Sequence, residues 1–83
     1  MPSYLVEAYA AKGSFERERD LAQLAGDLGS GVRYVRSTFL PGDEAILHVF
    51  EAASIEALRE AGGRAGLQYE RIVEAVERPG PDT

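Results

Sequence analysis

The chain has 83 residues, no cysteine and a formal net charge of −5, from 14 acidic and nine basic residues. Its length predicts one small domain with a marginal core. The absence of cysteine excludes disulfides, thiolate metal sites and thiol nucleophiles. The acidic balance argues against nucleic acid and anionic membranes as partners, because both bind clustered positive charge. No stretch approaches the roughly 20 apolar residues of a membrane helix. With no signal peptide visible, we expect a cytoplasmic protein.

The first half of the chain predicts a strand, a helix and a second strand. Ser3–Tyr9 is a short, apolar-rich segment whose side chains alternate in character from one residue to the next, as those of a strand do. Ser14 is the expected N-cap of a helix in which Leu21–Leu28 carries apolar residues at the i, i+3, i+4 and i+7 positions. Glycines at 29 and 31 end this helix. Val32–Leu40 is rich in β-branched and aromatic residues and predicts the second strand.

The second half repeats the pattern after a tight turn. Pro41 and Gly42 predict a type II turn, because proline fixes φ at the second position and glycine supplies a positive φ at the third. The third strand, Glu44–Phe50, is then antiparallel to the second. Ser54 is the expected N-cap of a second helix, which ends before Gly66.

The last strand, Tyr69–Glu77, completes a β-α-β-β-α-β order. This order predicts an α+β, ferredoxin-like sandwich with an antiparallel sheet in the order 4-1-3-2 and both helices on one face. We expect a single domain over 1–77 and a flexible tail over 78–83. The residues expected to face the helices are small to medium and apolar: Val6, Ala8, Ala45, Leu47, Val49, Val73 and Ala75.

The opposite sheet face is predicted to carry a binding site. In three of the predicted strands, every second residue points to this face, and the first and last of these residues are apolar while the middle one is polar. The middle residues are Glu7, His48 and Glu74. Two neighbouring carboxylates repel each other unless a cation or a shared proton lies between them. Together with imidazole they suit a divalent transition metal such as nickel or zinc. The wider ligand site is predicted to comprise Glu7, Tyr9, Arg36, Ser37, Phe39, His48, Phe50 and Glu74, where Ser37 and Phe39 join it if the second strand has no bulge.

Other interpretations of these residues stay open. The trio could move a proton on an organic ligand, or Arg36, Arg71 or an arginine of a partner could neutralise the glutamates in an interface. Large apolar side chains around the trio would make an improbable solvent face, so we expect a homodimer that closes two sheets over each other. Pro2 would supply a secondary amine, as in the tautomerases, if Met1 were removed.

Several segments carry a family resemblance. Tyr4-Leu5-Val6-Glu7, Val32-Arg33-Tyr34, Ser37-Thr38-Phe39, Phe50-Glu51-Ala52, Arg59-Glu60-Ala61, Ala65-Gly66-Leu67 and Arg71-Ile72-Val73-Glu74 resemble a family of small bacterial ferredoxin-like domains of unknown function. Some of its relatives bind nickel through a His-x-x-x-His pair in the second helix and histidine near the end of the first strand. In this chain the positions that match those histidines hold Ala61, Ala65 and Ala8-Tyr9. Of the pattern seen in the nickel-binding relatives, only Glu7, Glu74 and their surroundings are present.

The preferred interpretation is a homodimer that binds a metal ion or a small organic ligand on the open sheet face. The alternatives are a cofactor-free enzyme that transfers protons, such as an isomerase, cyclase or tautomerase, and a purely structural or regulatory dimer. Nucleic acid and membranes are not expected partners.

Overall fold

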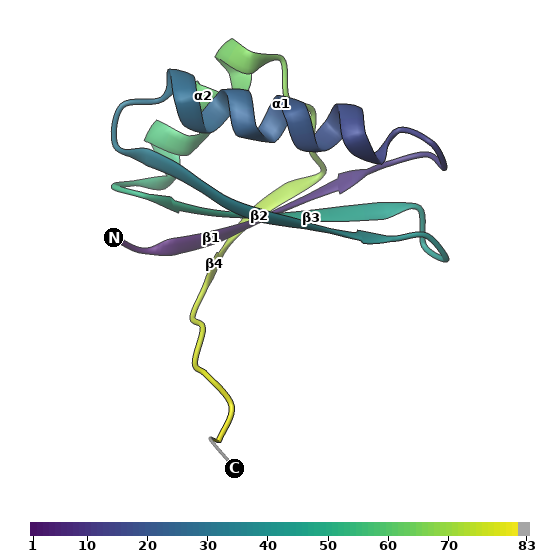
Figure 1. The fold of residues 1–83 in the computed structure, drawn as a ribbon. Coiled ribbons are helices and arrows are strands. Elements are labelled where there is room, and N and C mark those ends of the chain that lie inside the picture. Colours follow the sequence, from purple (N-terminus) through teal and green to yellow (C-terminus); the bar gives the residue numbers. More distant parts are fainter. Residues whose placement is uncertain (82–83) are drawn as a thin grey trace.

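The computed structural model describes residues 1–81 as four strands and two helices. The elements in chain order are β1 (Ser3–Tyr9), α1 (Phe15–Leu28), β2 (Val32–Leu40), β3 (Ala45–Ala52), α2 (Ile55–Ala65) and β4 (Arg71–Ala75). The sheet order is β2-β3-β1-β4, and all three strand pairs are antiparallel. Both helices cover one face of the sheet, and the other face is open (Figure 1). The ferredoxin-like sandwich predicted from the sequence is confirmed.

The ends of the elements differ slightly from the prediction. Strand β4 is shorter than the expected Tyr69–Glu77, and residues 76–81 have no regular secondary structure. Of the expected tail, 82 and 83 lie outside the described residues. Ser54 caps α2 by accepting a hydrogen bond from the backbone N–H of Ala57 at 3.1 Å. Ser14 precedes α1, but its hydroxyl donates to the carbonyl of Ala11 instead of accepting from the helix.

The connection between β2 and β3 is not the expected type II turn. Gly42 does not adopt a positive φ; Glu44 does, at 49°. Two successive turns form, because Asp43 N–H donates to the Leu40 carbonyl and Glu44 N–H donates to the Pro41 carbonyl. The loop between the two strands therefore has four residues, 41–44, and its last residue is left-handed. The loop therefore ends on a carboxylate side chain beside the first residue of β3.

The prediction of which strand residues face the helices was largely wrong. The paired rows show that Val6 and Ala8 do face them, together with Tyr4, Ile46, His48 and Phe50. The open face instead carries most of the small to medium set, namely Ala45, Leu47, Val49, Val73 and Ala75.

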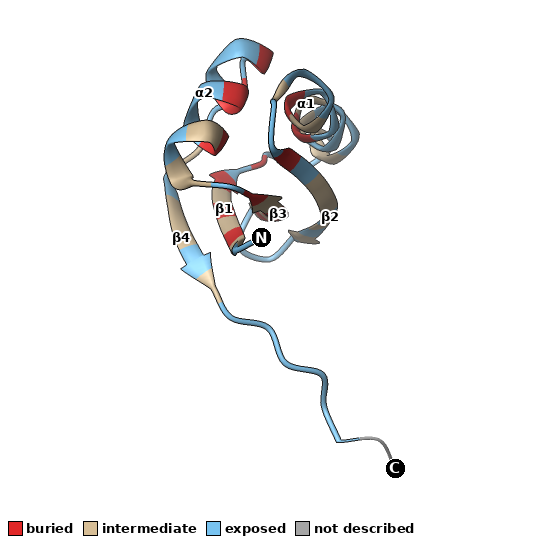
Figure 2. Ribbon diagram, turned by 90° about the vertical axis from the view of Figure 1, so that its left-hand side faces the viewer, coloured by how far each residue is buried: buried red, intermediate tan, exposed pale blue. Residues whose placement is uncertain are grey.

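The reason lies in the helices, whose buried residues are small. Helix α1 buries Ala22 and Ala25, and α2 buries Leu58, Ala61, Gly62 and Ala65. Because protein interiors are packed to a uniform density, small helical side chains require large ones from the sheet. Tyr4, Ile46 and Phe50 supply that volume, and each is at most 7% exposed. Figure 2 shows the resulting buried layer between sheet and helices.

A bulge in β2 determines where its second half points. Tyr34 pairs with Phe50 and Arg36 pairs with Val49, which leaves Val35 without a partner. An extra residue reverses the alternation beyond it. Ser37 and Phe39 therefore face the helices, whereas Arg36 faces the open side.

Candidate functional site

The three residues predicted to form one site lie on different faces of the sheet. Glu7 pairs with Leu47 and Arg71 on the open face. His48 pairs with Val6 and Ser37 beneath the helices. Glu74 pairs with Tyr4, also on the helix side, at the exposed end of the edge strand β4. Paired residues of an antiparallel sheet share a face, so the predicted three-residue site does not form.

The other predicted ligand residues also divide between the faces. Tyr9 and Arg36 lie on the open side, and Tyr9 is 54% exposed. Ser37, Phe39 and Phe50 lie on the helix side with His48. Phe39 stacks on Phe15 of α1 with ring centroids 5.4 Å apart, so it serves packing. Within residues 1–81, no group of three or more histidine, aspartate or glutamate side chains could hold a metal ion. The metal expected from the sequence stays a prediction.

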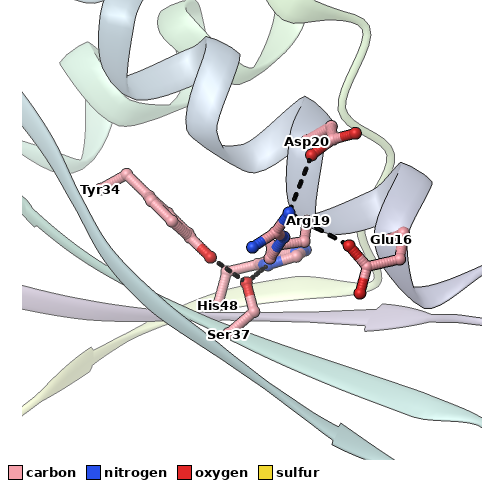
Figure 3. Close-up of polar contacts among 6 residues, drawn as sticks. All are labelled: Glu16, Arg19, Asp20, Tyr34, Ser37 and His48. Carbon is pink, nitrogen blue, oxygen red and sulfur yellow. Dashed lines mark hydrogen bonds and ion pairs between the residues drawn. The ribbon is translucent and has the colours of Figure 1, made fainter.

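A chain of three polar side chains runs beneath α1 (Figure 3). The hydroxyls of Tyr34 and Ser37 are 2.6 Å apart, and Ser37 Oγ lies 2.6 Å from Nδ1 of His48. His48 has no exposed surface, and within residues 1–81 its Nε2 has no hydrogen-bond partner. The sequence analysis missed Tyr34, because only the bulge at Val35 brings it to the same face as Ser37.

Burial holds His48 in its neutral form. Loss of solvent lowers the pKa of His48 from 6.5 to about 4, because charging the ring would place an unpaired cation in the core. Arg19 of α1 is paired with carboxylates of its own helix, Glu16 at 3.1 Å and Asp20 at 3.4 Å (Figure 3). A neutral imidazole could act as a base, but its burial denies a substrate access to it. The geometry favours a structural role for this histidine.

The open sheet face has an apolar centre. One row of paired residues crosses β3, β1 and β4 as Val49, Leu5 and Val73. The next row places Leu47 beside Glu7. Val49 is 7% exposed, and the other three apolar residues are half-buried.

The charges on this face are paired within the chain. Arg71 Nε donates to Glu7 at 3.1 Å, and Arg33 pairs with Glu51 at 2.7 Å. Arg36 pairs with Glu77 at 3.3 Å. The interpretation in which Arg71 neutralises Glu7 is therefore the arrangement found in the single chain.

A pocket of about 320 Å³ lies at one end of the open face. It includes Glu7 and Tyr9, two of the predicted ligand residues. The carboxylates of the hairpin loop, Asp43 and Glu44, and that of Glu70 line it as well. The full lining is Glu7, Ala8, Tyr9, Asp43, Glu44, Ala45 and Glu70. Sequence reasoning missed the carboxylates of Asp43, Glu44 and Glu70, because it placed Asp43 in a turn and the other two near the starts of strands, whereas all three lie in connections.

Comparison with known proteins identifies the fold. No family model and no curated protein matches the sequence. Among solved structures, SCO4226 from Streptomyces coelicolor A3(2) is similar, with a TM-score of 0.71 and 19% sequence identity. The match covers 93% of this chain and 99% of that one. At this identity the likeness shows the fold alone. No helix within residues 1–81 is both long and apolar enough to cross a membrane.

Proposed function

We propose that the protein is a homodimeric binding module. In this proposal the open sheet faces of two copies pack together, and a small organic molecule binds in the pocket at the end of each face. The observation that carries it is the apolar row Val49, Leu5 and Val73 on the face away from the helices, in which Leu5 and Val73 keep part of their surface exposed.

The pattern of charge on the open face supports association with a second copy. Glu7 and Glu51 are already paired with arginines of the same chain. Covering the face would then bury no unpaired carboxylate from these rows, which would otherwise oppose association strongly. A twofold dimer also brings the same apolar row of each copy against its counterpart, as an isologous interface requires.

The pocket supports the ligand part of the proposal. It combines the exposed ring of Tyr9 with carboxylates from β1, the hairpin loop and the segment before β4. Carboxylates attract cations, and an aromatic face adds a cation–π contribution of about 0.5–1 kcal/mol at an exposed site. The pocket therefore suits a small organic cation over an anion.

The cytoplasmic location expected from the sequence stays a prediction.

Sedimentation velocity on Leu47→Asp tests the dimer. A charge in the middle of the open face should convert a dimer into a monomer, because it would be buried without a partner. Leu24→Asp is the matched control, since Leu24 lies on α1 and is 41% exposed. This control should leave the dimer intact. A wild-type protein that stays monomeric at millimolar concentration would contradict the proposal.

Amide chemical shifts test the ligand class with two probes of similar size, phenethylamine and phenylacetate. We expect phenethylamine to shift the amides of Ala8, Tyr9 and Ala45, and phenylacetate to leave them unchanged. Glu44→Gln should weaken the response to the amine by removing one carboxylate. Equal responses to both probes, or none, would argue against a cation pocket.

A further inference from the structure

We propose that the segment after β4, residues 76–81, is an arm that lies across the open sheet face of a second copy and buries Val76 there. This inference rests on the proposed dimer and adds a contact that the sheet faces alone do not supply. The occupant of each face would be the second copy together with its arm.

The direction of the segment is the first argument. It leaves β4 on the side of the sheet opposite the helices and runs away from its own sheet (Figures 1 and 2). Val76 begins it and is 76% exposed. An apolar side chain so exposed keeps most of its contact with water in the single chain, so burial by a partner would stabilise the assembly.

The root of the segment is fixed in place. Glu77 accepts from the Arg36 guanidinium at 3.3 Å, and Arg36 belongs to β2, at the other edge of the sheet. The ion pair therefore spans the open face, so the arm starts over the face and not beside it. An ion pair this exposed contributes little stability by itself, but it restricts the direction in which the segment leaves β4.

The length of the segment matches the distance to be crossed. Pro79 and Pro81 favour an extended, polyproline-like chain, which rises about 3.1 Å per residue. The four residues beyond the Glu77 ion pair, 78–81, then span roughly 12 Å. Four strands about 4.8 Å apart make a sheet roughly 14 Å wide between its outer strands. One arm is therefore long enough to reach across three of the partner's four strands, and twofold symmetry would make the exchange reciprocal.

Paramagnetic labelling distinguishes contact between copies from contact within one. The chain lacks cysteine, so Gly80→Cys carries a spin label at a single position. Labelled protein at natural isotope abundance is mixed with ¹⁵N-labelled wild type. In mixed dimers we expect broadening of the ¹⁵N amides of Leu5, Leu47 and Val49, reversed by ascorbate. A dimer without this broadening would overturn the arm and leave the proposed function standing, whereas a protein with no dimer would remove both.

Val76→Asp provides a second measurement. Loss of one buried valine contact per copy should weaken the dimer at least about tenfold, measured by sedimentation equilibrium. Leu24→Asp again serves as the matched control, because it introduces the same charge on the opposite side of the molecule. An unchanged dissociation constant for Val76→Asp would show that Val76 is not buried by the partner.

Discussion

Ser37 and His48 face each other across β2 and β3, with Oγ of Ser37 2.6 Å from Nδ1 of His48. This contact satisfies one ring nitrogen in the core, while Nε2 stays unpaired within residues 1–81. The position of Ser37 depends on the bulge at Val35, since an unbulged strand would turn its hydroxyl to the opposite face. The hydrogen bond between Ser37 and His48 therefore depends on the bulge in β2.

Stability should fall between pH 6.5 and pH 4 through His48. The pKa of His48 is lowered to about 4 in the folded protein, whereas the unfolded chain has the ordinary value of 6.5. The unfolded state therefore binds more protons in this window. The group's contribution is complete above pH 6.5 and decreases by about 3 kcal/mol as the pH falls to 4.

His48→Phe isolates this effect in urea unfolding experiments. The variant lacks the titrating ring, so its free energy of unfolding should change less than that of wild type between pH 7 and pH 4. Carboxylates titrate in both proteins and cancel in the comparison. Parallel curves for the two proteins would contradict the assignment.

Ser37→Ala should destabilise the fold by about 1–3 kcal/mol, because it leaves the buried His48 ring and the half-buried Tyr34 hydroxyl without their shared partner. The neighbouring Thr38→Ala is the control: Thr38 is exposed, and its loss should change stability by no more than about 0.5 kcal/mol. Thermal unfolding of both variants measures the difference. Equal effects would show that the hydroxyl chain contributes nothing specific.

Two helical glycines should respond to alanine in opposite directions. A Cβ at Gly26 would lie 2.8 Å from Cβ and 2.9 Å from the backbone N of Tyr34, so Gly26→Ala must push α1 away from β2 and destabilise the fold. A Cβ at Gly63 would meet nothing within 4 Å. Gly63→Ala should therefore stabilise α2 by up to about 1 kcal/mol through helix propensity. Chemical denaturation ranks the two variants, and a stable Gly26→Ala would refute the close contact.

Nickel or zinc should not bind through Glu7, His48 and Glu74 together, because these side chains occupy two faces. We expect equimolar metal to leave the unfolding temperature of the tag-free protein unchanged. Stoichiometric metal that is lost on both Glu7→Gln and Glu74→Gln would contradict this expectation. Asp27→Gln, on the exposed side of α1, controls for nonspecific loss of charge.

The fold could be predicted from the sequence because its signals are local. The apolar spacing over Leu21–Leu28, the cap at Ser54 and the left-handed Gly66 each specify one element or end. The order of elements then leaves few topologies. The hairpin was predicted in place but not in type, since a four-residue loop and a two-residue loop share the same proline and glycine.

The candidate site could not be predicted, because strand alternation gives two faces without saying which one the helices cover. The larger set, with Tyr4 and Phe50, went inward to fill the space above Ala22 and Ala61. The small residues of the helices were visible in the sequence and could have indicated this choice. The bulge at Val35 contains no glycine or proline, so the sequence of β2 gives no local signal that predicts it.

The same bulge bears on how the protein avoids forming fibres. Strand β2 is one outer edge of the sheet, and its irregular middle, flanked by Arg33 and Arg36, offers a poor template for a further strand. The other edge, β4, is only five residues long and is soon followed by prolines. Because neither edge strand is a good template, repeated addition of strands from other copies is disfavoured. Concentrated protein should therefore stay in finite, closed assemblies.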